Sequence, residues 1–311
     1  MSLAPFVRIV ARGKGRARAM TFEESQEAMT IILQGRAAAE AVGALLMVLR
    51  LRGETDAEIA GFTAALRAHV SGVVPVADLD WPSYAAGRTR GAPLYLLAAR
   101  LVAQAGYRVS LHGWNTHQAA QLTAAQVQAL VGPDVRYHPL ADLCPEALAL
   151  LALRDDLGLR SCINTVLRMW NPSGAAASVQ GVFHPSYRGL QARAAAMLGQ
   201  QTLSVIKGGG GEFERHPSKE ISVFGLRKGA HIELPAPALW RQTRRLHDGD
   251  EAVDAQAVWK GHCDDGFAQA TVIGTAALAL WTLDAAPDFA DAEDMARTLW
   301  ATREKQQKDS R

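Results

Sequence analysis

The sequence has few of the residues that mark a disulfide-stabilised or a membrane protein. Its three cysteines, Cys144, Cys162 and Cys263, are odd in number and far apart, so neither a disulfide framework nor a CxxC zinc site is expected. No apolar run reaches the ~18 to 20 residues that span a bilayer, and the charges near the N-terminus follow the short apolar patch instead of preceding it. A cytoplasmic protein without membrane contact is therefore expected.

An excess of charge of either sign is also lacking. The formal net charge is only +2, which excludes a polycation. Positive charge is nevertheless concentrated in residues 1–18. This segment has no acidic residue, and its basic residues are Arg8, Arg12, Lys14, Arg16 and Arg18. Such a segment can contact successive phosphates of a nucleic acid without reading its bases. A solvated helix entrance is the alternative interpretation of the same charges.

What the sequence does have is apolar residues, 49% of 311, enough to bury a large core. Up to about residue 70 the signals are helical. Thr21 and Thr55 each precede a glutamate by three positions, which is the pattern of a capping box. The Ala/Leu-rich stretch 37–51 lies between them and stops before Gly53, a residue suited to a helix end. These signals predict a small helical bundle.

Beyond Gly72 the pattern changes to short β-branched or alternating segments separated by Ala-rich helical ones. Strands are expected at 107–112, 179–183, 202–206, 220–224 and 231–234. Helices are expected near 93–105, 123–130, 145–156, 187–198, 252–260 and 268–283. Strands spaced by helices favour a parallel sheet covered on both faces.

The expected fold class is therefore α/β, with an N-terminal helical bundle domain and a larger domain that has a mainly parallel β-sheet flanked by helices. The expected boundaries are a basic N-terminal arm at 1–20, a helical dimerisation domain at 21–72 and an α/β domain at 73–311. The apolar helix faces of the bundle are the expected homodimer contact.

Several segments resemble one known family. Residues 31–69 contain a turn at Gly35, the helix GALLMVLR and the step from Arg52 to Thr55. This stretch is similar to the helical domain of the anthranilate phosphoribosyltransferase and class II nucleoside phosphorylase family, glycosyl transferase family 3. The resemblance resumes at RDDLGLRSCIN, residues 154–164, and at GVFHP, residues 181–185. It implies that a segment within about 155–178 returns to the helical domain.

The resemblance also locates the family's phosphate motifs, and most of them are altered. The Gly-Thr-Gly-Gly-Asp loop, whose backbone N–H groups surround a diphosphate, corresponds to DWPSYAAGR at 80–88. Pro82 has no N–H, and Trp81 and Tyr84 are bulky. A phosphate-contacting lysine corresponds to Leu111, beside a retained His112. The resemblance therefore implies a site without most of its diphosphate donors.

The metal motif is reduced as well. The Asp-Glu pair that holds magnesium in the family corresponds to Phe213 and Glu214, so Glu212 and Glu214 remain only as weak candidates for a hard cation. No cofactor is expected, and Mg²⁺ enters only if the protein is a transferase.

The glycine run after Lys207 is a separate candidate. Four glycines follow this lysine, and glycine-rich backbone can bind anions. The sequence predicts an anion site at Lys207, Gly208 and Gly209, with a flexible turn as the alternative.

Two main functions follow. The family resemblance includes a branch with degenerate transferase motifs that binds DNA or RNA nonspecifically as a homodimer. In that case the basic arm contacts phosphates, with Arg88 and Arg90 near the altered loop. The alternative is a glycosyl or phosphoribosyl transferase acting on a phosphoribosyl or nucleoside-like substrate in the interdomain cleft. Its candidate residues are His112, Arg154, Asn164 and Glu214.

Arg154 has two interpretations in this second function. It matches a family arginine that can meet an acidic acceptor, and it can instead pair with a carboxylate on its own helix. A ligand sensor that kept only the fold is a third possibility for the whole protein.

Overall fold

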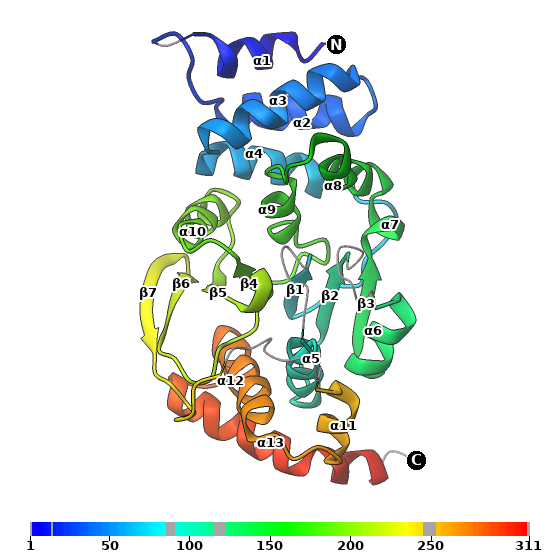
Figure 1. Cartoon of the computed structure of the whole chain (residues 1–311), viewed down its shortest axis with the longest axis vertical. Coiled ribbons are helices and arrows are strands. Elements are labelled where there is room, and N and C mark those ends of the chain that lie inside the picture. The colour runs from blue at the N-terminus through cyan, green and yellow to red at the C-terminus, as the bar shows by residue number, and fades with distance from the viewer. Residues whose placement is uncertain (1, 14, 85–90, 115–121, 245–252, 310–311) are drawn as a thin grey trace.

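The computed structural model describes residues 2–13, 15–84, 91–114, 122–244 and 253–309. Lys14, Arg88 and Arg90 lie outside these residues, so their predicted nucleic-acid contacts are not placed by the structure. The helical bundle forms one end of the molecule and helix α13 lies at the other (Figure 1).

The helical bundle consists of α1 (Ala4–Ala11), α2 (Phe22–Leu33), α3 (Ala39–Arg52) and α4 (Asp56–Arg67). Both predicted capping boxes are present, with Glu24 and Glu58 accepting from the backbone of Thr21 and Thr55. Helices α2 and α4 approach closely at Gly61, where a Cβ atom would lie 2.2 Å from the Phe22 carbonyl oxygen. Only glycine allows this contact.

The first residues differ from the arm that the charges suggested. Ala4–Ala11 form a helix whose apolar side buries Phe6 and Val10 in the core shared with α2–α4, while Arg8 and Arg12 are exposed. The 3.6-residue spacing of the apolar positions produces this amphipathic helix, and the charge pattern had masked it.

The sheet has seven strands: β1 (Leu79–Ser83), β2 (Val109–Gly113), β3 (Val135–Pro139), β4 (Ala177–Val182), β5 (Thr202–Lys207), β6 (Ile221–Arg227) and β7 (Ala230–Ala236). Their order is β3-β2-β1-β4-β5-β6-β7. Strands β1–β5 pair in parallel, and β6 and β7 extend the sheet antiparallel. The predicted mainly parallel sheet is confirmed, with an antiparallel hairpin at one edge.

Helices surround the sheet: α5 (Leu94–Gln104), α6 (Ala124–Val131), α7 (Leu140–Leu143), α8 (Pro145–Leu157), α9 (Ile163–Arg168), α10 (Tyr187–Met197), α11 (Ala255–Lys260), α12 (Gly266–Thr282) and α13 (Phe289–Asp309). Side chains of β5 alternate between the faces. Leu203 and Val205 join the core of the bundle and α10, and Ile206 joins that of α5, α12 and α13.

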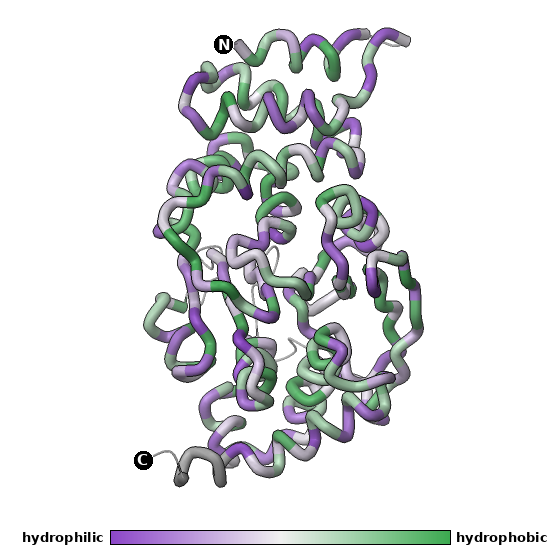
Figure 2. The backbone as a smooth tube through the Cα atoms, turned by 180° about the vertical axis from the view of Figure 1, so that it is seen from behind, coloured by the Kyte–Doolittle hydropathy of each residue, from purple (hydrophilic) through white to green (hydrophobic). Residues whose placement is uncertain are grey.

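The described helices include none long and apolar enough to cross a membrane. Figure 2 shows polar segments interleaved with apolar ones along the length of the molecule.

The topology fixes where a ligand is expected. From β1 the chain continues outward to β2 and β3, whereas β4 and β5 lie on the other side of β1. The order therefore reverses between β1 and β4. In open parallel sheets, ligands bind beyond the carboxyl ends of the strands at such a reversal.

Candidate functional site

At the carboxyl end of β1, buried side chains fill the space. Tyr84 Oη and His112 Nδ1 are hydrogen-bonded at 2.7 Å, and His112 Nε2 lies 3.1 Å from Asp80 Oδ1. The second oxygen of Asp80 accepts from Ser178 Oγ at 2.9 Å. Tyr84, His112 and Asp80 are fully buried. Burial, followed by the charge of Asp80, raises the pKa of Tyr84 well above its usual value.

The other altered positions are buried too. Trp81 and Leu111 are fully buried, and Trp81 meets Phe213 edge to face with ring centroids 5.4 Å apart. Ser83 Oγ and Tyr95 Oη are hydrogen-bonded at 2.8 Å. Residues 79–84 therefore form a packed strand end.

The residues that correspond to the magnesium motif do not fit a magnesium ion. Glu214 Oε2 accepts the backbone N–H of Tyr95 at 2.9 Å, at the start of α5. Both Glu212 and Glu214 are buried, at 1% and 0% exposure, and Phe213 supplies a ring where a carboxylate would be needed. Magnesium requires octahedral oxygen ligands and keeps several waters, which this packing does not accommodate.

The four transferase candidates are not brought together. His112 and Glu214 are held in the contacts above. Arg154 Nε lies 3.2 Å from Asp155 Oδ1 on α8, the pairing with a carboxylate of its own helix. Asn164 lines a different cavity, at the carboxyl end of β4.

That cavity lies between the helical bundle and the α/β domain, and we call it the arginine pocket. It has a volume of about 90 Å³. Its walls come from α3, from α9 and the residues just before it, from the end of β4 and the residues after it, and from α10. The lining residues are Arg50, Arg160, Ser161, Asn164, Thr165, Arg168, Val182, Phe183, His184, Tyr187 and Gln191.

A larger cavity shares Phe183 and His184 with the arginine pocket, and we call it the Lys207 groove. Its volume is about 850 Å³. It runs from the carboxyl ends of β4 and β5 to the start of β6. Its charged and aromatic lining residues are Phe183, His184, Arg188, Lys207, His216, Lys219, Glu220 and Arg244.

The structure places the predicted anion site in this groove but changes its donors. Lys207 is exposed there. The Gly208 N–H donates to the Val182 carbonyl and the Gly209 N–H to the Glu214 carbonyl. The predicted use of these two amides for an anion is therefore wrong in this conformation, because they are engaged within the chain. The lysine side chain is the donor that remains.

The groove is electropositive. The pKa of His216 is lowered by burial and further by Lys219 and Lys207, although a bond to the Arg244 carbonyl opposes this. Phe183 is 49% exposed at the shared wall and meets His184 edge to face. An exposed ring beside cations is suited to a ligand with a flat ring and a phosphate.

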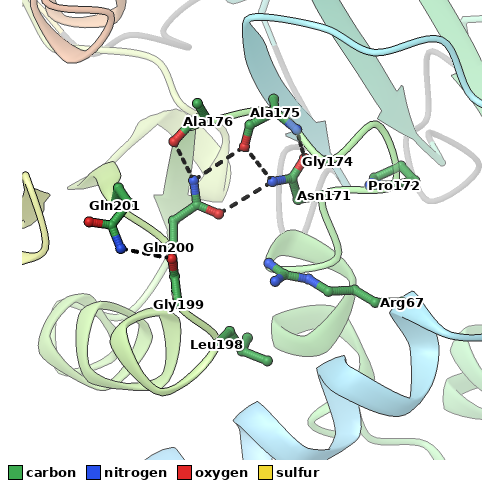
Figure 3. Close-up of a pocket in the computed structure, with 10 residues that line it drawn as sticks. All are labelled: Arg67, Asn171, Pro172, Gly174, Ala175, Ala176, Leu198, Gly199, Gln200 and Gln201. Carbon is green, nitrogen blue, oxygen red and sulfur yellow. Dashed lines mark hydrogen bonds between the residues drawn. The ribbon is translucent and has the colours of Figure 1, made fainter.

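A third cavity lies around the amino end of β4 and is a weaker candidate (Figure 3). Its polar groups bond within the protein. The Asn171 amide donates to the Ala175 carbonyl at 2.8 Å, and Gln200 Nε2 to the Ala176 carbonyl at 2.7 Å. Arg67 donates to the carbonyls of Met169 and Trp170. These hydrogen bonds hold the segment between α9 and β4 in place, so we assign them a structural role.

The basic N-terminal residues have unequal surroundings. Arg8, Arg12 and Arg16 are exposed. Arg18 forms two bonds of 2.6 Å with Glu24, which is also the capping-box glutamate. Arg18 is thus held by the helix start.

Sequence reasoning missed Phe183, Arg168 and Gln191 as site residues. The motif GVFHP carries only a family resemblance in the sequence, yet it covers the last two residues of β4 and the three residues after them, at the sheet reversal. Its position after a buried strand is the signal that could have identified Phe183 and His184. Arg168 and Gln191 lie on helix faces that give no such signal.

The fold and cleft define a two-part α/β protein with a helical bundle. A model described as the helical bundle domain of a glycosyl transferase family matches residues 6–70. An anthranilate phosphoribosyltransferase from a Methylobacterium species is 30% identical over 74% of this chain and 72% of its own. The enzyme of that name from Thermomicrobium roseum is 27% identical over 89% and 88%.

The solved structure of anthranilate phosphoribosyltransferase from Thermus thermophilus shares the fold, with a TM-score of 0.76, 24% identity and 92% coverage of each chain. A variant of the Saccharomyces cerevisiae enzyme, with magnesium bound, gives a TM-score of 0.72 at 14% identity, with 97% of this chain and 95% of that chain covered. The chain belongs to the anthranilate phosphoribosyltransferase-like family of glycosyl transferases, family 3.

Proposed function

We propose that this protein is a glycosyl or phosphoribosyl transferase that takes a phosphoribosyl or nucleoside-like substrate in the Lys207 groove. The reaction class comes from the relatives, which are anthranilate phosphoribosyltransferases. The proposal moves the substrate from the ends of β1 and β2, which Tyr84 and His112 occupy, to the ends of β4 and β5.

The observation that carries the proposal is the combination of Lys207 with the exposed ring of Phe183 in one cavity. Lys207 would hold the phosphate as a point charge, with Lys219 adding positive potential. The Phe183 ring would stack on the base or other ring of the substrate. The volume of about 850 Å³ is within the range of small-molecule sites.

Calorimetry with ribose 5-phosphate, a nucleoside monophosphate and phosphoribosyl diphosphate tests this proposal. Binding that is weakened by Lys207→Ala and Phe183→Ala supports it. The transfer step is then measured as release of the leaving group from the ligand that binds.

A nonspecific nucleic-acid-binding homodimer is the second candidate, favoured by one observation. Arg8, Arg12 and Arg16 are exposed along α1 and the turn after it, so they could contact a phosphate backbone together. In this proposal the apolar helix faces of the bundle pair with a second copy. The cytoplasm is the expected location for either function.

A further inference from the structure

The arginine pocket contains polar atoms that the protein leaves without a hydrogen bond. Asn164 is 6% exposed and Gln191 is 0% exposed. Nδ2 of Asn164 and both amide atoms of Gln191 have no hydrogen-bond partner among the described residues. Nη2 of Arg168, which is 5% exposed, has none there either. Buried polar groups are almost always bonded, so these groups indicate a partner outside the chain.

The charge of the pocket identifies the kind of partner. Arg50, Arg160 and Arg168 line it, and its described lining includes no carboxylate. Burial lowers the pKa of Arg160, and the neighbouring Arg154 and Arg50 lower it further. Burial likewise lowers the pKa of Arg168. The guanidinium groups repel one another, and an anion between them would remove that repulsion.

Two carboxylates lie nearby and only partly offset this charge. The charge of Glu212 acts on Arg168. Glu54, which does not line the pocket, accepts a hydrogen bond from Tyr187 Oη at 2.8 Å. The three arginines of the pocket exceed these two carboxylates, so a positive charge remains. The side-chain amides of Asn164 and Gln191 can also donate hydrogen bonds to an anion.

The size of the pocket limits the partner. A volume of about 90 Å³ is well below the ~300 Å³ at which typical small-molecule sites begin, which suits one small oxyanion. Arginine presents several N–H groups in a plane that matches phosphate oxygens. We infer that the arginine pocket binds a phosphate-type oxyanion, as free phosphate or as the phosphomonoester end of a larger molecule.

The arginine pocket adjoins the Lys207 groove at Phe183 and His184 and does not include Lys207, so the inference does not rest on the proposed function. The anion would contact α3 of the helical bundle together with α9 and α10. It would therefore connect the bundle to the α/β domain.

Calorimetry with sodium phosphate tests the inference, using sodium chloride of equal ionic strength as the blank. The Lys207→Ala chain is used beside the wild type, so that binding in the groove is weakened while the arginine pocket is unchanged. We expect phosphate to bind in both. Arg160→Gln and Gln191→Leu should each weaken binding about tenfold or more, because each removes a donor to a charged group. Arg36→Gln, at an exposed arginine of the bundle, is the matched control and should bind as the wild type does.

A second readout guards against misfolding of the variants. Without phosphate, Gln191→Leu should raise the Tm, since it removes a buried amide that has no partner. Ribose 5-phosphate that binds to the Lys207→Ala chain when free phosphate does not, and that binds more weakly once Arg160→Gln is added, would assign the arginine pocket to a phosphomonoester end. Unchanged phosphate affinity in both Arg160→Gln and Gln191→Leu would overturn the inference and assign the polar atoms to water. Heat no greater than that of chloride from both sodium phosphate and ribose 5-phosphate would overturn it equally.

Discussion

Tyr84 Oη and His112 Nδ1 are hydrogen-bonded at 2.7 Å where the family places its diphosphate loop. Because Asp80 lies on the other side of the imidazole, the three side chains form one buried polar chain. The Tyr84–His112 hydrogen bond is the one that a single substitution removes most cleanly, and a buried group that loses its partner is destabilising.

Tyr84→Phe should therefore destabilise the protein. The change leaves His112 Nδ1 buried without its partner, so we expect a loss of about 1–3 kcal/mol in the free energy of unfolding. Urea denaturation measures it. Tyr107→Phe, at a half-buried tyrosine before β2, should change stability much less. Equal effects in the two variants would show that the Tyr84 hydroxyl contributes nothing specific.

Acid should weaken the start of α2. The hydrogen bond from Arg18 lowers the pKa of Glu24 to about 2, below its unfolded value of about 4.3. A depressed carboxyl pKa gives stability that is complete above the unfolded pKa and is lost as pH falls towards 2. The stability difference between wild type and Glu24→Gln should shrink over this window, with 1 M salt reducing it at higher pH. A difference that does not vary between pH 5 and 2 would contradict the pairing.

His216 gives a second pH test, in the Lys207 groove. Its pKa is lowered by burial and by Lys219 and Lys207, so its stabilising effect is complete above about 6.5 and is lost as pH falls. Sulfate, which keeps its charge in this range, should restore part of the stability at pH 6 by offsetting the two lysines. The measurement is Tm against pH, with and without sulfate. His216→Gln should remove this pH dependence, and a sulfate effect unchanged in that variant would place the anion elsewhere.

The nucleic-acid candidate predicts a salt dependence. If Arg8, Arg12 and Arg16 contact phosphates, their replacement by alanine should flatten the log–log salt slope by roughly 0.9 per contact on duplex and 0.7 on single strands. Affinity should fall alike for every sequence. Fluorescence anisotropy measures both. A triple variant at the exposed Arg36, Lys260 and Arg297 carries the same charge change. An equal loss of affinity in the two triple variants would show that binding depends on the net charge of the protein and not on contacts made by Arg8, Arg12 and Arg16.

Much of the fold could be predicted because its signals are local. Thr21 and Thr55 marked helix starts by chemistry that acts within four residues. Strands β1 and β3 were missed: Pro82 interrupts the first, and the second, VRYHP, is only partly buried. α1 was hidden by its charges.

The site was less predictable, because its contacts join distant residues. Comparison with the family predicts that Trp81 and Tyr84 fill space that a phosphate would need, and both side chains are fully buried. It could not indicate that Glu214 accepts from Tyr95, 119 positions away, nor that Gln191 and Arg168 line one pocket with Arg50. Contacts between residues so far apart in the sequence arise only when the helices and strands pack together, so no local pattern in the sequence indicates them.

Calorimetry of the whole chain with ribose 5-phosphate and a nucleoside monophosphate, beside anisotropy with a labelled single strand, tests the central claim most directly. The proposed function predicts saturable heat from at least one small ligand. It also predicts about tenfold weaker binding in Lys207→Ala and no such loss in Lys228→Ala, at a lysine on the turn between β6 and β7. No heat from any small ligand, together with binding of the strand, would contradict the claim and establish nucleic-acid binding in its place.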